Sequence, residues 1–262
     1  MRLRFLGTGT SFGVPVVGCS CDVCTSTDPR DRRTRHAAML ESDDEESRVL
    51  IDTPPELRLQ LLDAGISRIN AVWFTHDHAD HTHGIEDLRV FSARMKQSLP
   101  AYADPVTAAS LRGKFRYIFD HDYRPPEGTT RPEIRLFDFH PDASVNIAGF
   151  EMMPLRVPHG DTNVFGFRTG GLGYITDAKT IPDAARASLS GVRVLVLNAL
   201  WAGNPHPTHF NIEEAIEAAR DVGAERTYLT HMTHRVRHAA LTATLPRGVE
   251  PAYDGLVIEI PD

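Results

Sequence analysis

The sequence predicts a layered α/β domain in which the ends of strands carry the functional side chains. Four short β-rich runs each end in a candidate metal ligand, and segments with helical signals lie between them. In layered α/β folds, sites assemble where strands end, so we expect these four segments to converge. The chain has 262 residues, of which 41% are hydrophobic, and no linker divides it. We therefore expect a single domain over residues 1–262.

The first strand-like segment, residues 3–6, runs directly into a glycine-rich turn at residues 7–13. This turn lacks the Gly-Lys-Ser/Thr ending of a phosphate-binding P-loop, so we expect its glycines to let the backbone pass close to a site. Residues 40–51 predict a hairpin, with a solvated acidic turn at residues 42–47. Residues 55–65 predict a helix, because proline stands near the start of the amphipathic pattern and glycine just past its end.

Strands and helices alternate along the remainder of the chain. The expected strands are residues 71–75, 153–158, 172–176 and 226–230, and the expected helices are residues 84–96, 105–117, 211–222 and 234–245. Residues 119–132 are rich in proline, glycine and charge, which predicts a loop and makes it a candidate lid over the site. His121 lies in this loop and is interpreted as an ordinary polar residue.

A dense group of metal-binding side chains follows the strand at residues 71–75. It consists of His76, His78, Asp80 and His81. Imidazoles and carboxylates are strong ligands for divalent ions, and an ordinary polar loop does not concentrate them in this way. The pattern therefore predicts a metal site at the end of this strand.

The charge balance gives no support for a general electrostatic grip on nucleic acid. The chain has 28 lysines and arginines against 35 aspartates and glutamates, a formal net charge of −7, and no long basic run. A local basic groove stays open as an alternative. The chain begins in a strand-like alternation without a signal-peptide pattern, and no apolar span is long enough to cross a bilayer. We expect a cytoplasmic protein that does not bind a membrane.

The cysteines of this chain are Cys19, Cys21 and Cys24, in a loop at about residues 18–35. Their close spacing and odd number argue against a disulfide framework and favour metal binding. A tetrahedral zinc would need one further ligand from elsewhere in the chain. The alternative is a loop with three reduced thiols that bind no metal.

Three further candidate ligands, His159, Asp177 and His231, stand at the ends of later strands. A single catalytic zinc needs only three protein ligands and an open position, so the combined set fits a pair of ions better than one ion. Two ions about 4 Å apart would share Asp177 and a hydroxide, which would act as the nucleophile.

The His-x-His-x-Asp-His stretch, followed in order by these three residues, resembles the metallo-β-lactamase superfamily over nearly the whole chain. The resemblance implies an αββα four-layer sandwich, with a dinuclear metal site at the edges of its two sheets. It also implies which residues hold each ion. One ion would be held by His76, His78 and His159, the other by Asp80, His81 and His231, and Asp177 would bridge them.

Within the superfamily, the chain is similar to the PhnP branch of cyclic phosphodiesterases. The similarity rests on the Cys-x-Cys-x-x-Cys run, on residues 84–89 and on the His-Met-Thr-His run at residues 231–234. The resemblance implies a separate structural zinc, held by Cys19, Cys21, Cys24 and His234. A closed site rich in thiolates suits a structural zinc, whereas an open His/Asp site suits hydrolysis.

Residues 207–215 resemble a segment of PhnP and tRNase Z in which a histidine before a helix contacts the phosphate and assists the leaving group. The resemblance makes His209 the candidate general acid, with His206 as a weaker rival. The candidate catalytic residues are therefore Asp80 and His209. We interpret His83 as a residue of the surface or of the layer behind the ligands.

The resulting prediction is a metal-dependent phosphodiesterase with two Mn²⁺ or Zn²⁺ ions, acting on ribosyl 1,2-cyclic phosphates or 2′,3′-cyclic nucleotides. The main alternative is a nuclease for RNA 3′ ends or short oligonucleotides, although the chain lacks a long insertion like the tRNA-binding arm of the tRNase Z branch. The fold alone also allows a thioester or lactam hydrolase. A zinc-containing interaction scaffold without catalytic activity is an alternative of another class. Family precedent implies a homodimer.

Overall fold

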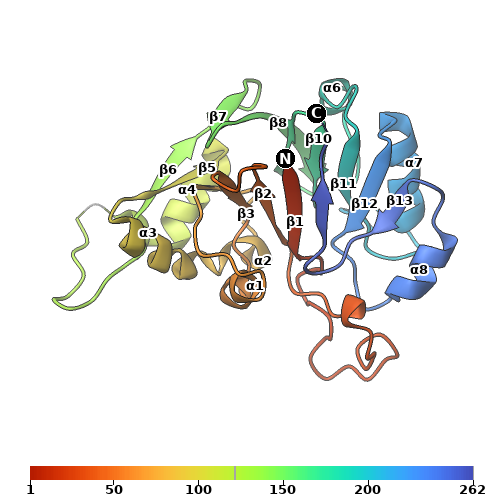
Figure 1. The fold of residues 1–262 in the computed structure, drawn as a ribbon, viewed down its shortest axis with the longest axis horizontal. Coiled ribbons are helices and arrows are strands. Elements are labelled where there is room, and N and C mark those ends of the chain that lie inside the picture. Colours follow the sequence, from red (N-terminus) through yellow and green to blue (C-terminus); the bar gives the residue numbers. More distant parts are fainter. Residues whose placement is uncertain (121, 262) are drawn as a thin grey trace.

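Two mixed, seven-stranded sheets packed face to face form the centre of the protein, with helices on both outer faces (Figure 1). The computed structural model describes residues 1–120 and 122–261. This arrangement confirms the αββα sandwich in one domain. In the described part of the chain, every helix is too short or too polar to span a membrane.

The strand order of the first sheet is β14 (Val257–Glu259), β1 (Arg2–Gly7), β2 (Ala37–Glu41), β3 (Arg48–Ile51), β4 (Ala71–Trp73), β5 (Leu99–Ala103) and β6 (Ile134–Asp138). The order of the second sheet is β13 (Val249–Pro251), β12 (Arg226–Thr230), β11 (Val194–Asn198), β10 (Leu172–Ile175), β9 (Thr162–Thr169), β8 (Phe150–His159) and β7 (Val145–Ile147). The helices are α1 (Leu57–Asp63), α2 (Ala79–Thr82), α3 (Arg89–Met95), α4 (Pro105–Lys114), α5 (Arg116–Phe119), α6 (Asp183–Ser188), α7 (Ile212–Val222) and α8 (His238–Thr244), with 3₁₀ turns η1 (Pro29–Asp31) and η2 (Ile85–Leu88).

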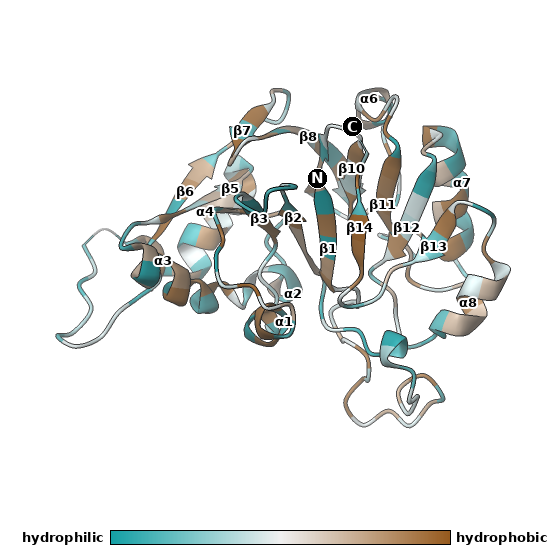
Figure 2. Ribbon diagram, viewed as in Figure 1, coloured by the Kyte–Doolittle hydropathy of each residue, from teal (hydrophilic) through white to brown (hydrophobic). Residues whose placement is uncertain are grey.

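The central strands are buried on both faces, which explains why their sequences are continuous apolar runs (Figure 2). In β4, Ala71 and Trp73 belong to the core between the sheets, whereas Val72 belongs to the core beneath the helices of the first sheet. Trp73 also joins the sheets directly, because its Nε1 donates a hydrogen bond of 3.0 Å to the carbonyl oxygen of Phe165 in β9. Burial of each such large side chain contributes about 1.5–3 kcal/mol.

Most expected helices are confirmed, with changes at their boundaries. α7 begins after Asn211, whose side chain accepts from the Glu214 N–H while the Glu214 carboxylate accepts from the Asn211 N–H. The expected helix at residues 105–117 is divided into α4 and α5, because Phe115 has the non-helical ψ of 46°. The expected helix at residues 234–245 was wrong in its first turn, since α8 begins at residue 238. The residues before it form a loop that presents two candidate metal ligands.

The parallel parts of the two sheets bring several strand ends to one edge. β3 and β4 run parallel in the first sheet, as do β10, β11 and β12 in the second. The residues that follow three of these strands, Asp52, Asp177 and His231, have positive φ angles of 63°, 55° and 57°. This left-handed conformation costs of order 1–3 kcal/mol for residues other than glycine, and such strained positions cluster at functional sites.

The glycines of the turn at residues 7–13 allow a close approach, but to another backbone segment. A Cβ atom at Gly7 would lie 2.0 Å from the carbonyl oxygen of Arg35, and one at Gly9 would lie 2.8 Å from that of Arg33. These glycines allow the chain after β1 to pack against the segment that precedes β2. The turn also passes close to the predicted site, because the carbonyl oxygen of Thr8 accepts a hydrogen bond of 2.9 Å from the N–H of Met232, the residue after His231.

Candidate metal centre

The structure brings all seven predicted ligands of the dinuclear site together at the shared edge of the sheets. The ligand atoms of His76, His78 and His159 all lie within 4.8 Å of one another. The same is true of a second group, which consists of Asp80, His81 and His231. Asp177 belongs to a third group with His76 and His81, and to a fourth with His159 and His209. It thus lies next to members of both ligand sets, where a bridging residue would be.

A short connection after β4 supplies the first four of these side chains. His76 follows the strand and is buried, whereas His78 is exposed and precedes the first residue of α2. Asp80 and His81 lie within this single helical turn, so their side chains start close together. Thr75 fixes the start of the connection, because its carbonyl oxygen accepts a hydrogen bond of 2.9 Å from the N–H of Phe165 in the opposite sheet.

Several buried nitrogen atoms at this edge lack the partners that buried polar atoms normally have. The Nε2 atoms of His76 and His81 and both ring nitrogens of His231 form no hydrogen bond with any described residue. An unsatisfied buried polar atom costs about 1–3 kcal/mol. Because these atoms gather around the carboxylate of Asp177, the residues fit a site for metal cations.

The distances between these ligand atoms also fit metal ions. Asp177 Oδ2 lies 3.4 Å from His231 Nε2, and Asp177 Oδ1 lies 3.6 Å from His81 Nε2. A tetrahedral ion with bonds of about 2.1 Å separates neighbouring ligands by about 3.4 Å. Asp80 Oδ2 is 3.6 Å from His81 Nε2, which extends the same spacing to the second carboxylate.

Hydrogen bonds behind the ligands direct their free nitrogens toward this centre. His81 Nδ1 lies 2.7 Å from Asp52 Oδ2, and the Asp52 carboxylate also accepts from the N–H and the hydroxyl of Thr75. His159 Nδ1 lies 3.2 Å from the carbonyl oxygen of Thr208, to which it donates. In both rings Nδ1 is occupied, so Nε2 is left to bind a cation, as is usual for histidines that ligate metals.

The electrostatics of the centre favour ligation at most positions. Burial alone would raise the pKa of Asp177, but the surrounding imidazoles, led by His231, hold it well below its usual value. Burial lowers the pKa of His231 to about 4, so this ring is neutral at neutral pH. His81 differs, because Asp177, Asp80 and Asp52 raise its pKa well above the usual value against the effect of burial. A cation would have to replace a proton there.

Asp52 and His36 are parts of the centre that the sequence did not reveal to us. Asp52 had a usable signal, because it follows β3 as His76 follows β4. His36 had none, since it stands before a strand. It is completely buried, its Nε2 lies 2.5 Å from the Tyr174 hydroxyl, and its ring is 5.7 Å from that of His231. It therefore supports the ligands from behind.

Exchange of Asp52 for asparagine should lower metal affinity at the centre about 10- to 100-fold, because an amide holds the Nδ1–H of His81 less strongly than a carboxylate. Competition with a chromophoric chelator measures this affinity. The matched control is Asp183→Asn, the same exchange at an exposed position of α6. Equal affinities in the two variants would show that Asp52 does not orient His81.

His209 lies at the centre, and the other two histidines considered from the sequence lie outside it. His209 Nε2 is 3.1 Å from Asp177 Oδ2, and its ring centroid is 4.6 Å from that of His159. The His206 ring is one step further out, 5.1 Å from that of His209. His83 is exposed and packs edge-on against Phe115, which confirms it as a surface residue.

The three cysteines surround His234, as the resemblance implied. The Sγ atoms of Cys19, Cys21 and Cys24 lie 3.3, 3.6 and 3.5 Å from His234 Nδ1. A tetrahedral zinc with Zn–S bonds of about 2.3 Å and a Zn–N bond of about 2.0 Å separates sulfur from nitrogen by about 3.5 Å. The backbone N–H of Cys24 is the main cause that lowers the pKa of Cys21 to about 6, whereas burial raises that of Cys24 to about 11. The geometry fits one tetrahedral zinc.

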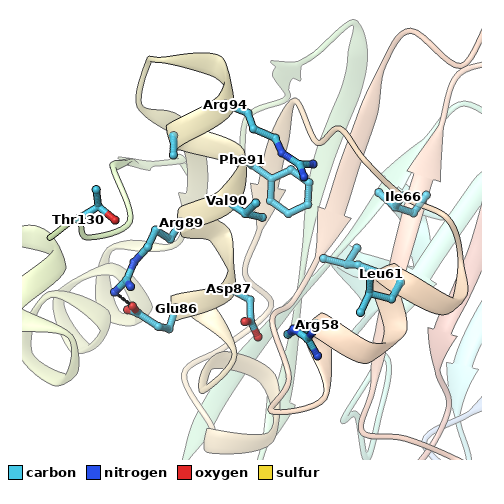
Figure 3. A pocket seen from close by; sticks show the side chains of 12 residues that line it. Arg58, Leu61, Ile66, Glu86, Asp87, Arg89, Val90, Phe91, Arg94 and Thr130 are labelled. Carbon is cyan, nitrogen blue, oxygen red and sulfur yellow. Dashed lines mark hydrogen bonds and ion pairs between the residues drawn. The ribbon is translucent and has the colours of Figure 1, made fainter. Parts of the chain in front are cut away.

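Among the described residues, neither the candidate lid nor the best-formed cavity supplies a ligand to this centre. His121 lies outside the described residues, and Arg131 of the same loop donates to the carbonyl oxygens of Tyr117 and Asp120 rather than to the centre. A cavity of about 500 Å³ lies between α1 and α3, with Arg58, Phe91 and Arg94 in its lining (Figure 3). Its lining among the described residues holds no histidine or cysteine, so we do not assign a metal site to it.

Comparison with known proteins shows the family of this chain. The chain matches the beta-lactamase superfamily domain over residues 47–232. A crystal structure described as that of a new diphosphatase from the PhnP family is 37% identical, with a TM-score of 0.89, and the match covers 99% of this chain and 98% of that one. The short form of human tRNase Z, at 20% identity, a TM-score of 0.69 and full coverage of both chains, shares the fold.

A longer relative carries a different name. An octanoyltransferase from Porphyromonas gingivalis is 37% identical over 257 residues, which are 98% of this chain and 51% of that protein. This chain thus spans about half the length of that relative. The activity in the relative's name belongs to that longer protein as a whole. From the superfamily match and the PhnP-family structure, we conclude that this chain belongs to the beta-lactamase superfamily, within its PhnP family, and is a metal-dependent hydrolase.

Proposed function

We propose that this protein is a phosphodiesterase for small cyclic phosphates, of the ribosyl 1,2-cyclic phosphate or 2′,3′-cyclic nucleotide type. The observation that carries the proposal is the position of Asp177 between two ligand groups, with His209 beside it. In the proposed site each group holds one divalent ion, Mn²⁺ or Zn²⁺. Such a pair of ions neutralises charge on a phosphodiester and lowers the pKa of water to about 7.

The surroundings of His209 support its role as a proton donor. Nε2 faces the carboxylate of Asp177, while Nδ1 lies 3.3 Å from Nδ1 of His206. That His206 atom accepts from the backbone N–H of Thr208 at 3.3 Å, so it is free of a proton and is an acceptor for His209. The Thr208 hydroxyl is nearer, at 2.9 Å from His209 Nδ1, and its oxygen is also able to accept, so both ring nitrogens of His209 face groups that accept hydrogen bonds. This arrangement suits a protonated ring that stabilises charge on the phosphate or protonates the leaving oxygen.

The relatives also support phosphate chemistry over other hydrolytic reactions. The solved structure at 37% identity is described as a diphosphatase, so a relative along the whole chain acts on phosphate groups. The likeness to tRNase Z is one of fold alone. A net charge of −7 also gives no help to a nuclease that must attract a polyanion.

Exchange of His209 for alanine should lower kcat for 2′,3′-cyclic AMP about 10²- to 10⁴-fold, the range that general acid catalysis supplies. Metal content should stay at the wild-type value, since His209 is outside the seven proposed ligands. Kinetics and elemental analysis of the same preparation measure both quantities. His206→Ala is the matched control and should have the smaller effect. Loss of metal from the His209 variant would make it a ligand instead of an acid.

The proposed substrate class is tested on metal-loaded protein with three substrates in parallel: 2′,3′-cyclic AMP, bis-p-nitrophenyl phosphate and a short single-stranded RNA. We expect the highest kcat/KM for the cyclic nucleotide. Preference for RNA would transfer the function to the nuclease alternative. Full metal loading without hydrolysis of any of the three would contradict a phosphodiesterase.

A further inference from the structure

A row of planar side chains in contact with one another leads outward from the metal centre to the surface. The first ring is His209, beside Asp177, and His206 follows it. The indole of Trp201 then meets the His206 ring edge-on, with 5.4 Å between centroids and 82° between planes. The guanidinium carbon of Arg235 lies 4.7 Å from the centroid of the Trp201 ring. Arg235 is exposed and Trp201 is half-buried, so the row ends at the solvent.

The Trp201 end of this row is held in place by hydrogen bonds. Trp201 Nε1 donates to the carbonyl oxygen of Asn204 at 2.8 Å, which fixes the orientation of the indole. The intervening Gly203 is held by Glu213, whose carboxylate accepts from its N–H, and by Asn211, whose side-chain amide donates to its carbonyl oxygen. The loop is therefore fixed before any ligand binds, which reduces the entropy lost on binding.

The backbone of Arg235 is fixed from the other side. It directly follows His234, which the three cysteines surround, and its backbone N–H donates to the Thr233 hydroxyl at 3.3 Å. Within the described residues Arg235 forms no ion pair, so its guanidinium has the indole as its side-chain partner. A planar, charged group that is stacked on one side and open on the other offers a surface for an aromatic ring.

We propose that Trp201 and Arg235, stacked beside His206 at the rim of the metal centre, form a subsite for the nucleobase of a nucleoside cyclic phosphate. The proposal rests on the proposed function and deepens it, because it favours nucleotides over sugar phosphates without a base. A base bound there lies on the open face of the guanidinium, which itself covers the Trp201 ring, and its phosphate is directed toward the metal centre. Stacking of this kind accepts any base, so we expect selectivity for the presence of a base more than for its identity.

The test compares 2′,3′-cyclic AMP with glycerol 1,2-cyclic phosphate, which has the same reactive ring and no base. In Arg235→Ala and Trp201→Ala, the ratio of kcat/KM for the first substrate to that for the second should fall at least about fivefold, the lower limit of what stacking contributes. Arg235→Lys should not restore the ratio, because lysine keeps the charge and lacks the plane. Arg237→Ala, an exposed arginine in the same segment, should leave the ratio at the wild-type value.

Two outcomes would overturn the subsite. Full restoration of the ratio by lysine would indicate an anion subsite. An unchanged ratio in the alanine variants would also overturn it, and an equal loss of kcat/KM for both substrates would then indicate a structural role. Trp201→Phe keeps an aromatic ring, so it should lower the ratio less than Trp201→Ala does. It also keeps the test usable if Trp201→Ala does not fold.

A binding measurement separates failure of the subsite from failure of the proposed function. The chain has two tryptophans, of which Trp73 is completely buried, so a fluorescence change on titration with adenosine 3′-monophosphate reports Trp201. We expect quenching that Arg235→Ala weakens, whether or not any phosphodiester is hydrolysed. Absence of quenching in an enzyme that hydrolyses both cyclic phosphates would overturn the subsite and leave the proposed function intact.

Discussion

Exchange of Asp177 for asparagine is expected to lower kcat for a cyclic phosphodiester about 10³-fold or more and to remove metal from the His/Asp centre. Asparagine tolerates the left-handed backbone at this position, so the fold should survive. What is lost is the negative charge that both ligand groups face. Loss of about 4 kcal/mol of charge stabilisation by metal corresponds to a 10³-fold lower rate.

The control for this exchange is Asp161→Asn, because Asp161 is exposed in the turn between β8 and β9, close to the same edge. Elemental analysis and steady-state kinetics on both variants give metal content and rate. An Asp177 variant with wild-type metal content and wild-type kcat would show that this carboxylate does not bridge the ions.

Exchange of Cys21 for serine is expected to release one zinc per chain and to destabilise the protein. Binding of zinc at 1,000 times its dissociation constant stabilises a folded chain by about 4 kcal/mol. For a chain of this size, that loss lowers the midpoint of thermal unfolding by about 10 °C. Calorimetry and elemental analysis measure the two effects. The other ions should stay bound, because the cysteine group shares no ligand with the His/Asp groups.

Ser20→Ala changes a neighbouring exposed residue of the same loop and serves as the matched control. It should keep the zinc and the wild-type midpoint. A Cys21 variant that retains its zinc and its midpoint would argue that the three thiols are reduced residues of an ordinary loop.

The sequence was sufficient for the parts of this protein that depend on local spacing. His76 and His81 are separated by a fixed number of residues, so one short connection holds them together whatever the rest of the chain does. The capped start of α7 at Asn211 was readable for the same reason. Asp177 and His231 needed one further assumption, that the ends of parallel strands meet, and the structure bears it out.

The parts that could not be predicted depend on contacts between distant segments. Asp52 acts on His81 only because β3 and β4 are neighbours in the sheet. The late start of α8 depends on the cluster around His234, whose sulfur ligands are more than 200 residues away in the chain. Local patterns carry no information on such pairings. Likewise, the glycine-rich turn signalled a close approach without indicating which segment would make it.

The most direct test of the account is to locate the ions in crystals of the zinc-loaded protein by anomalous scattering at the zinc absorption edge. A dinuclear centre with a separate structural zinc predicts three peaks per chain, two on either side of the Asp177 carboxylate and one among the Sγ atoms of the three cysteines. One peak at the His/Asp centre, or peaks away from Asp177, would contradict a dinuclear centre and the mechanism proposed for it.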